Sequence, residues 1–139
     1  MGTKIVVENK LSAIQKYLTV LKRYTRYSRK ELEHTIDIRG AVERYLYLTV
    51  QSVIDCAEAV IALKHFRKPT SLSETFYILN EHGVLTDNQT EVFVKMSGFR
   101  NVIAHDYEKI DYDIVYDVLH TKRKDITLFV KTIKRYCGV

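Results

Sequence analysis

Residues 41–63 read AVERYLYLTVQSVIDCAEAVIAL, and their apolar spacing decides the fold class of this chain. Apolar side chains recur here in alternating steps of three and four residues, which is the period of an α-helix. A second apolar row runs beside the first. The rows are Val42, Leu46, Thr49, Val53, Cys56, Val60 and Leu63, and Tyr47, Val50, Ile54, Ala57 and Ile61. Because two rows make a face wider than one neighbour covers, this helix should lie centrally in a bundle or also form a dimer interface.

The helix that contains this stretch is predicted to span residues 29–65, and Gly40 favours a bend or a break near its start. Its polar face carries Arg44, Gln51, Asp55 and Glu58. Asp55 and Glu58 lie one turn apart, a spacing that could bind a metal or serve acid–base chemistry. No histidine or further carboxylate joins them at ligand spacing, so we interpret this face as solvated.

Other segments also have helical spacing. Residues 9–27 predict a first helix. Ser71 is the expected N-cap of another helix, with Glu74 as its capping-box partner, and Gly83 is placed like the residue that follows a helix end. Asp87 is the expected cap of the next helix, which runs into residues 100–107.

Asp111 is the expected cap of the last helical segment, which runs to about Tyr136, either unbroken or with a break at residues 122–124. No stretch alternates as a strand does. The sequence therefore predicts an all-α fold, an up-and-down helical bundle of four to five helices, with residues 1–139 as a single domain.

Composition narrows the class of protein further. The chain of 139 residues is 46% hydrophobic and contains one proline, which excludes a disordered chain and favours long helices. The N-terminal apolar run is too short for a signal peptide, and no apolar run approaches the ~18 residues of a membrane span. Cys56 and Cys137 lack metal-ligand spacing, so we expect a reduced, cytoplasmic protein without a disulfide or zinc.

The net charge of +5 is unevenly distributed. Residues 1–30 carry a net charge of +7 and residues 120–139 carry +5, whereas residues 31–119 carry −7. Two basic ends fit a polyanionic partner. They are equally consistent with lysines and arginines that only solvate the outer faces of terminal helices.

Residues 100–107 read RNVIAHDY and bring the most chemistry into one short segment. The imidazole of His105 can exchange a proton near neutral pH, and the guanidinium of Arg100 can hold phosphate oxygens through its planar donors. These two groups beside one phosphodiester would suffice for RNA cleavage without a metal or cofactor.

Helix geometry limits how these groups can meet. On a regular helix Arg100 and His105 would point ~140° apart, so we expect a frayed helix end with His105 turned back. Asn101 could hold that turn or contact the phosphate, Asp106 could orient the imidazole, and Tyr107 would point toward the same opening. The alternative is that Arg100 and His105 only complement the helix dipole, with Asp106 and Tyr107 as ordinary turn residues.

The segment resembles the R-x4-H-x-Y signature of the HepT-like branch of the HEPN superfamily, and the likeness covers most of the chain. It includes the stretches AVERYL at residues 41–46, SETFYIL at residues 73–79, GV at residues 83–84, MSGF at residues 96–99 and EKID at residues 108–111. Residues 1–30 are the least similar, and the role of residues 1–9 is open.

This resemblance implies a homodimeric, HEPN-like helical bundle in which both copies of the motif line one cleft. It implies a metal-independent RNA endonuclease toxin of a type VII-like toxin–antitoxin pair, with Arg100 and His105 as catalytic residues and no cofactor. The partners would be RNA and an MntA-type nucleotidyltransferase antitoxin. That antitoxin would transfer AMP to Tyr107, adding bulk and negative charge at the mouth of the cleft.

Two other functions fit the same features. The chain could be a non-catalytic accessory or substrate-binding helical subunit of a nucleotidyltransferase, with Tyr107 as a docking or modification site. It could also be a passive nucleic-acid-binding module, which would bind RNA in a salt-sensitive way without turnover.

Overall fold

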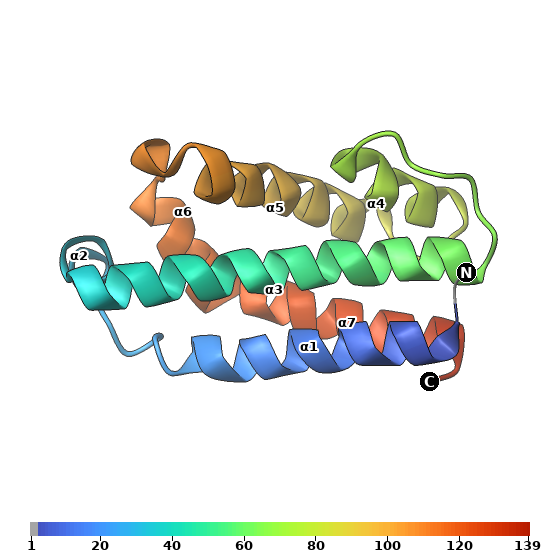
Figure 1. Ribbon diagram of the computed structural model, residues 1–139, viewed down its shortest axis with the longest axis horizontal. Helices are drawn as coiled ribbons and strands as arrows, with labels where there is room; N and C mark the ends of the chain where they lie inside the picture. The colour runs from blue at the N-terminus through green and yellow to red at the C-terminus, as the bar shows by residue number, and fades with distance from the viewer. Residues whose placement is uncertain (1–2) are drawn as a thin grey trace.

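The computed structural model describes residues 3–139, apart from the side chain of Tyr107, as a bundle of antiparallel helices (Figure 1). The helices in chain order are α1 (Lys4–Lys22), α2 (Arg29–His34), α3 (Ile36–Leu63), α4 (Leu72–Glu81), α5 (Asp87–His105), α6 (Tyr112–Asp117) and α7 (Arg123–Cys137). A 3-10 turn, η1 (Tyr107–Lys109), follows α5, and a π-helical turn, η2 (Val118–Lys122), joins α6 to α7. The described residues contain no strand, so the predicted all-α class is confirmed.

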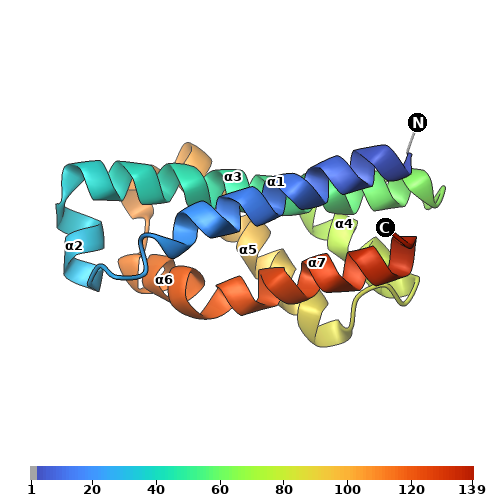
Figure 2. The same cartoon turned by 90° about the horizontal axis from the view of Figure 1, so that it is seen from below.

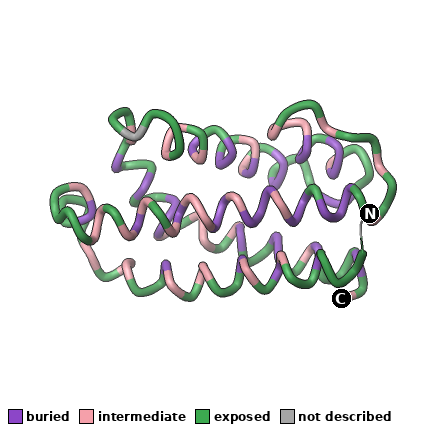
Figure 3. Tube along the Cα trace, in the orientation of Figure 1, coloured by how far each residue is buried: buried purple, intermediate pink, exposed green. Residues whose placement is uncertain are grey.

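Helix α3 is the centre of the bundle, which is one of the two arrangements that its double apolar row predicts. It packs against α1, α2, α4, α5 and α7, and purple buried positions follow most of its length in Figure 3. Its length and hydropathy would also allow a membrane span, but 61% of its most apolar window is buried inside the bundle. The wide apolar face is therefore used mainly to hold the neighbouring helices.

The core divides into two clusters along the bundle axis. One lies around Phe76, Phe93 and Phe129, whose side chains are at most 1% exposed, and the rings of Phe93 and Phe129 meet edge to face at 5.0 Å. The other surrounds Leu46 and Tyr112, near the end of α5. This second cluster fixes the end of α5 against α3 and α6.

The break before α3 falls at Thr35 and not at Gly40, which corrects the prediction of one long helix from residue 29. Ser28 and Glu31 form a complete capping box for the short helix α2, whose Leu32 is fully buried. Gly40 lies inside α3, where an added Cβ would meet nothing within 4 Å. The chain turns at Thr35 because α2 packs against α3 and α6. A glycine on an open helix face, such as Gly40, does not force the helix to break.

The predicted caps are confirmed in part. The side chains of Ser71 and Asp111 accept backbone N–H bonds at the starts of α4 and α6. Helix α5, however, is capped by Thr86 in a capping box with Gln89, and Asp87 is its first residue. The acidic side chain then lies in the first turn, where the helix dipole favours it.

Two other expectations also need correction. Thr3 caps α1 at Lys4, so this helix runs over residues 4–22 and not 9–27. The carboxylate of Glu74 bonds to the backbone N–H of Thr70 and to Arg67, which holds the loop before α4 in place of a reciprocal capping box. Residues 122–124 contain no break, because the chain passes from η2 directly into α7.

Candidate functional site

The last turn of α5 faces a groove between α3 and α5. Its volume is about 510 Å³, and its lining is Gly40, Glu43, Arg44, Tyr47, Ile103, Ala104 and His105. The α3 members recur at helical spacing on one side of that helix. The groove therefore combines a strip of α3 with the C-terminal turn of α5.

Arg100 lies one turn before this groove and is held by three neighbours. Its Nε donates to Oε1 of Gln51 at 2.8 Å, one terminal nitrogen donates to Oδ1 of Asn101 at 2.8 Å, and the other donates to the hydroxyl of Tyr47 at 3.0 Å. Guanidinium has five N–H groups. These three bonds to described side chains leave one N–H on each terminal nitrogen, which is the arrangement that grips a phosphate in a bidentate way.

Gln51 is itself fixed by a chain of contacts. Its Nε2 donates to Oδ1 of Asp55 at 2.8 Å, and Asp55 lies 3.7 Å from Nζ of Lys10 on α1. The expectation of a simply solvated polar face is therefore wrong for Gln51 and Asp55, which are both half-buried. An amide whose nitrogen is occupied by a carboxylate must turn its oxygen the other way, here toward Arg100.

His105 is the last residue of α5 and is exposed. The helix stays regular up to His105, and the N–H of Asp106 closes it by donating to the carbonyl of Val102 at 2.9 Å. The predicted fraying with a turned-back His105 is therefore wrong. The two groups nevertheless share a surface, because Tyr47 lines the groove with His105 and also bonds Arg100.

The other predicted site residues have different surroundings. Oδ1 of Asn101 accepts a bond from Arg100, so Asn101 orients the guanidinium in this structure. The carboxylate of Asp106 lies 3.6 Å from Nζ of Lys109, and its role toward the imidazole stays a prediction. The backbone of Tyr107 begins η1, whereas its side chain lies outside the described residues.

Glu43 and Arg44 add charge to the groove. The sequence predicted no functional role for either residue. The carboxylate of Glu43 receives bonds from Nε of Arg39 at 2.9 Å and from the hydroxyl of Tyr112. Arg44 is exposed beside it. Glu43 and Arg44 lie one helical turn before Tyr47. They could have been assigned to the groove from the sequence only if the register between α3 and α5 had been known.

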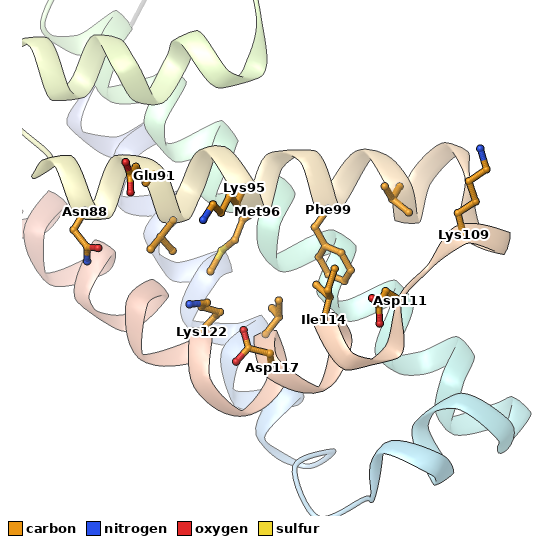
Figure 4. Close-up of a pocket in the computed structure, with 13 residues that line it drawn as sticks. Asn88, Glu91, Lys95, Met96, Phe99, Lys109, Asp111, Ile114, Asp117 and Lys122 are labelled. Carbon is orange, nitrogen blue, oxygen red and sulfur yellow. The ribbon is translucent and has the colours of Figure 1, made fainter.

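A second hollow of about 560 Å³ lies on the other side of α5, against α6 and η2 (Figure 4). Met96, Phe99 and Ile114 form its apolar floor, and lysines and carboxylates stand at its rim. Its lining contains no imidazole. The hollow can bury apolar surface, whereas His105 lines the α3–α5 groove and Arg100 lies one turn before it.

The described residues offer neither a cluster of metal ligands nor a reactive thiol. They contain no group of three or more His, Cys, Asp or Glu side chains placed to hold a metal ion. Cys56 and Cys137 are free and buried, and burial raises the pKa of the Cys56 thiol to about 12. A thiol held in its neutral form is a poor nucleophile.

Comparison with known protein families matches residues 14–133 to the family described as "Ribonuclease HepT-like". The chain is 26% identical over 132 residues to a protein of Aphanizomenon flos-aquae named tRNA nuclease HepT, covering 95% of this chain and 90% of that protein. It is 25% identical over 130 residues to the mRNA nuclease HepT of Shewanella oneidensis, covering 93% and 96%.

A solved structure has the same fold at low sequence identity. It is described as the tri-AMPylated Shewanella oneidensis HEPN toxin in complex with MNT antitoxin. The TM-score is 0.85 at 22% identity, with 94% of this chain and 97% of that chain covered.

Proposed function

The chain belongs to the HepT-like ribonuclease family, and we propose that it is a metal-independent RNA endonuclease toxin that acts through Arg100 and His105. The observation that supports this most is that Tyr47, which lines the α3–α5 groove together with His105, also accepts a hydrogen bond from Arg100. The two curated relatives are both named as HepT nucleases. That favours an enzyme over the non-catalytic alternatives.

The cleavage we propose uses the RNA's own 2′-hydroxyl as nucleophile. The 2′-oxygen attacks the adjacent phosphorus, the bond from phosphorus to the 5′-oxygen breaks, and the 2′-proton leaves while the 5′-oxygen gains one. His105 transfers a proton in this step, which is the role that an imidazole most often has in general acid–base catalysis. Arg100 binds the phosphate oxygens and stabilises the charge that builds on them. The products are a 2′,3′-cyclic phosphate and a 5′-hydroxyl.

Regulation by a nucleotidyltransferase antitoxin of the MntA type is part of this proposal. A structurally similar toxin is AMPylated and bound to an MNT antitoxin, and Tyr107 follows His105 by two residues. An adenylate there would place a negative phosphate and a large base beside the groove, which repels and blocks RNA. The proposal further includes a type VII-like toxin–antitoxin pair, a homodimer, residues 1–139 as one HEPN-like domain, and a cytoplasmic location.

The test is cleavage of labelled RNA by the purified chain in the presence of a chelator. We expect cyclic-phosphate ends from the wild type, and no cleavage by Arg100→Ala or His105→Ala. His34→Ala is the matched control, because His34 is an exposed histidine at the end of α2 that does not line the groove. Wild-type rates in His105→Ala would contradict the assignment.

A further inference from the structure

The structure brings the two basic ends of the sequence together on one side of the bundle. Helix α7 lies beside α1 (Figure 2). The loop after α1 meets η2, the turn that leads into α7, where Nε2 of His120 is 2.8 Å from the carbonyl oxygen of Thr25. Residues that are remote in sequence thus form one surface, which we name the α1–α7 basic face. Its exposed cations are Lys22, Arg23, Arg26, Lys124, Lys131 and Lys134.

Three shallow grooves on this face are lined by cations without any carboxylate. Two of them share Thr127 and Lys131, and so form one continuous trough along α7 and across to α1. The third lies on the loop after α1. Asp125 is the acidic residue of α7, and it lines none of the three. By comparison, the α3–α5 groove is lined by both an arginine, Arg44, and a carboxylate, Glu43.

No ion pair between described residues neutralises the positive charge of this face. The ion pairs formed by described residues involve Lys10, Arg29, His34, Arg39, Arg67 and Lys109. None of the six cations of the α1–α7 basic face takes part in them. The face therefore keeps its full positive charge, which can attract a negatively charged partner. Solvation of the two helices alone would not require the cations to gather on one face without carboxylates.

The shape and chemistry of the face fit an RNA backbone better than an acidic protein. Lys124, Lys131 and Lys134 share one side of α7 and span about 15 Å, enough to meet several phosphates of one strand. At the loop, Arg26 stacks on Tyr27 at 4.9 Å, which pairs a cation with a ring on which an unpaired base can stack. Leu128 is the one large apolar side chain of the trough that is strongly exposed among the described residues, whereas protein interfaces are built around buried apolar anchors.

We propose that the α1–α7 basic face binds the phosphate backbone of the RNA substrate away from the cleavage site. The inference rests on the proposed ribonuclease function and extends it to the substrate class. The face lies on the α1–α7 side and the catalytic groove on the α3–α5 side. An RNA that contacts both must be long enough to pass around the bundle, so the face favours large, structured RNA over short oligonucleotides.

The experiment measures binding separately from cleavage, in the His105→Ala background. The test variant combines Lys124→Gln, Lys131→Gln and Lys134→Gln. The control removes the same charge elsewhere with Lys30→Gln, Lys68→Gln and Lys95→Gln, all at exposed positions. The probes are a fluorescent RNA stem-loop of tRNA size and a fluorescent poly-aspartate peptide, each titrated at several salt concentrations.

We expect the test variant to bind the RNA roughly tenfold more weakly at low salt. The slope of the logarithm of the binding constant against the logarithm of the salt concentration is negative, and its magnitude should decrease by about 2, because three phosphate contacts are lost. The control should keep most of the wild-type slope. Equal losses in both variants, or an unchanged RNA affinity, would overturn the proposal.

The other outcomes are equally decisive. Unchanged RNA affinity with lost poly-aspartate binding would assign the face to an acidic protein instead. The proposed function can fail independently, because a wild-type chain that binds RNA through this face and never cleaves it would remove the ribonuclease assignment alone.

Discussion

Replacing Gln51 by methionine should slow RNA cleavage about tenfold, because it releases one side of the Arg100 guanidinium. Oε1 of Gln51 accepts the Nε–H bond of Arg100 at 2.8 Å. A hydrogen bond to a charged group contributes about 1.5–3 kcal/mol, and about 1.4 kcal/mol is a tenfold change in rate. Tyr47 and Asn101 still hold the terminal nitrogens. We therefore expect the lower end of that range.

The assay is single-turnover cleavage of a fluorogenic dinucleotide, with circular dichroism as the check on folding. Gln15→Met is the matched control, because Gln15 is exposed on α1. The same substitution is then made in the Arg100→Lys background, where the cation and a residual rate are kept but the Nε–H group that bonds Gln51 is gone. If Gln51 acts through Arg100, it should have no further effect there.

Two results would refute this reasoning. A wild-type rate for Gln51→Met would show that the Nε–H bond does not matter for cleavage. An equal loss in the wild-type and Arg100→Lys backgrounds would show that Gln51 acts by another route.

Three further outcomes are expected. Co-expression with the cognate nucleotidyltransferase should add one or more AMP units to the intact mass, and Tyr107→Phe should abolish that gain; an equal gain in the variant would move the modification elsewhere. Phe129→Ala should lower the free energy of unfolding by about 3–5 kcal/mol in a urea melt, because the ring is fully buried; a loss below about 1 kcal/mol would contradict its place in the core. The Thr70 N–H and Arg67 lower the pKa of Glu74, so the stability that its carboxylate contributes is present above pH 4.5 and is lost on acidification. Glu74→Gln should therefore lower Tm at pH 7 and lower it progressively less below pH 4.5. A difference in Tm that does not change with pH would refute this.

The fold was largely predictable because its determinants are local in sequence. The double apolar row of residues 41–63 places α3 at the centre whatever its neighbours are. Thr86-x-x-Gln89 is a capping box that the sequence contains, so the start of α5 could have been placed from pattern alone. The corner at Thr35 could not, because it depends on burying Leu32 against other helices.

The site was predictable in its chemistry but not in its geometry. Residues 100–107 carry the guanidinium and the imidazole, and periodicity correctly puts them near a helix end. Two of the three partners of Arg100, Gln51 and Tyr47, come from α3, about 50 positions earlier in the sequence. Only the register between α3 and α5 reveals them. The expected fraying does not occur, and α5 is regular up to His105. Tyr47 of α3 connects the surroundings of the two residues, because it accepts a hydrogen bond from Arg100 and lines the groove with His105.

The most direct measurement of shared action by Arg100 and His105 is an NMR titration with a dinucleotide whose 2′-hydroxyl is replaced by hydrogen, so that it cannot be cleaved. The signals to follow are the His105 ring protons, the Arg100 Nε–H and the single phosphorus. We predict that all three shift along one binding curve with one Kd. A phosphorus signal that responds while either side chain stays unmoved at saturation would contradict the account.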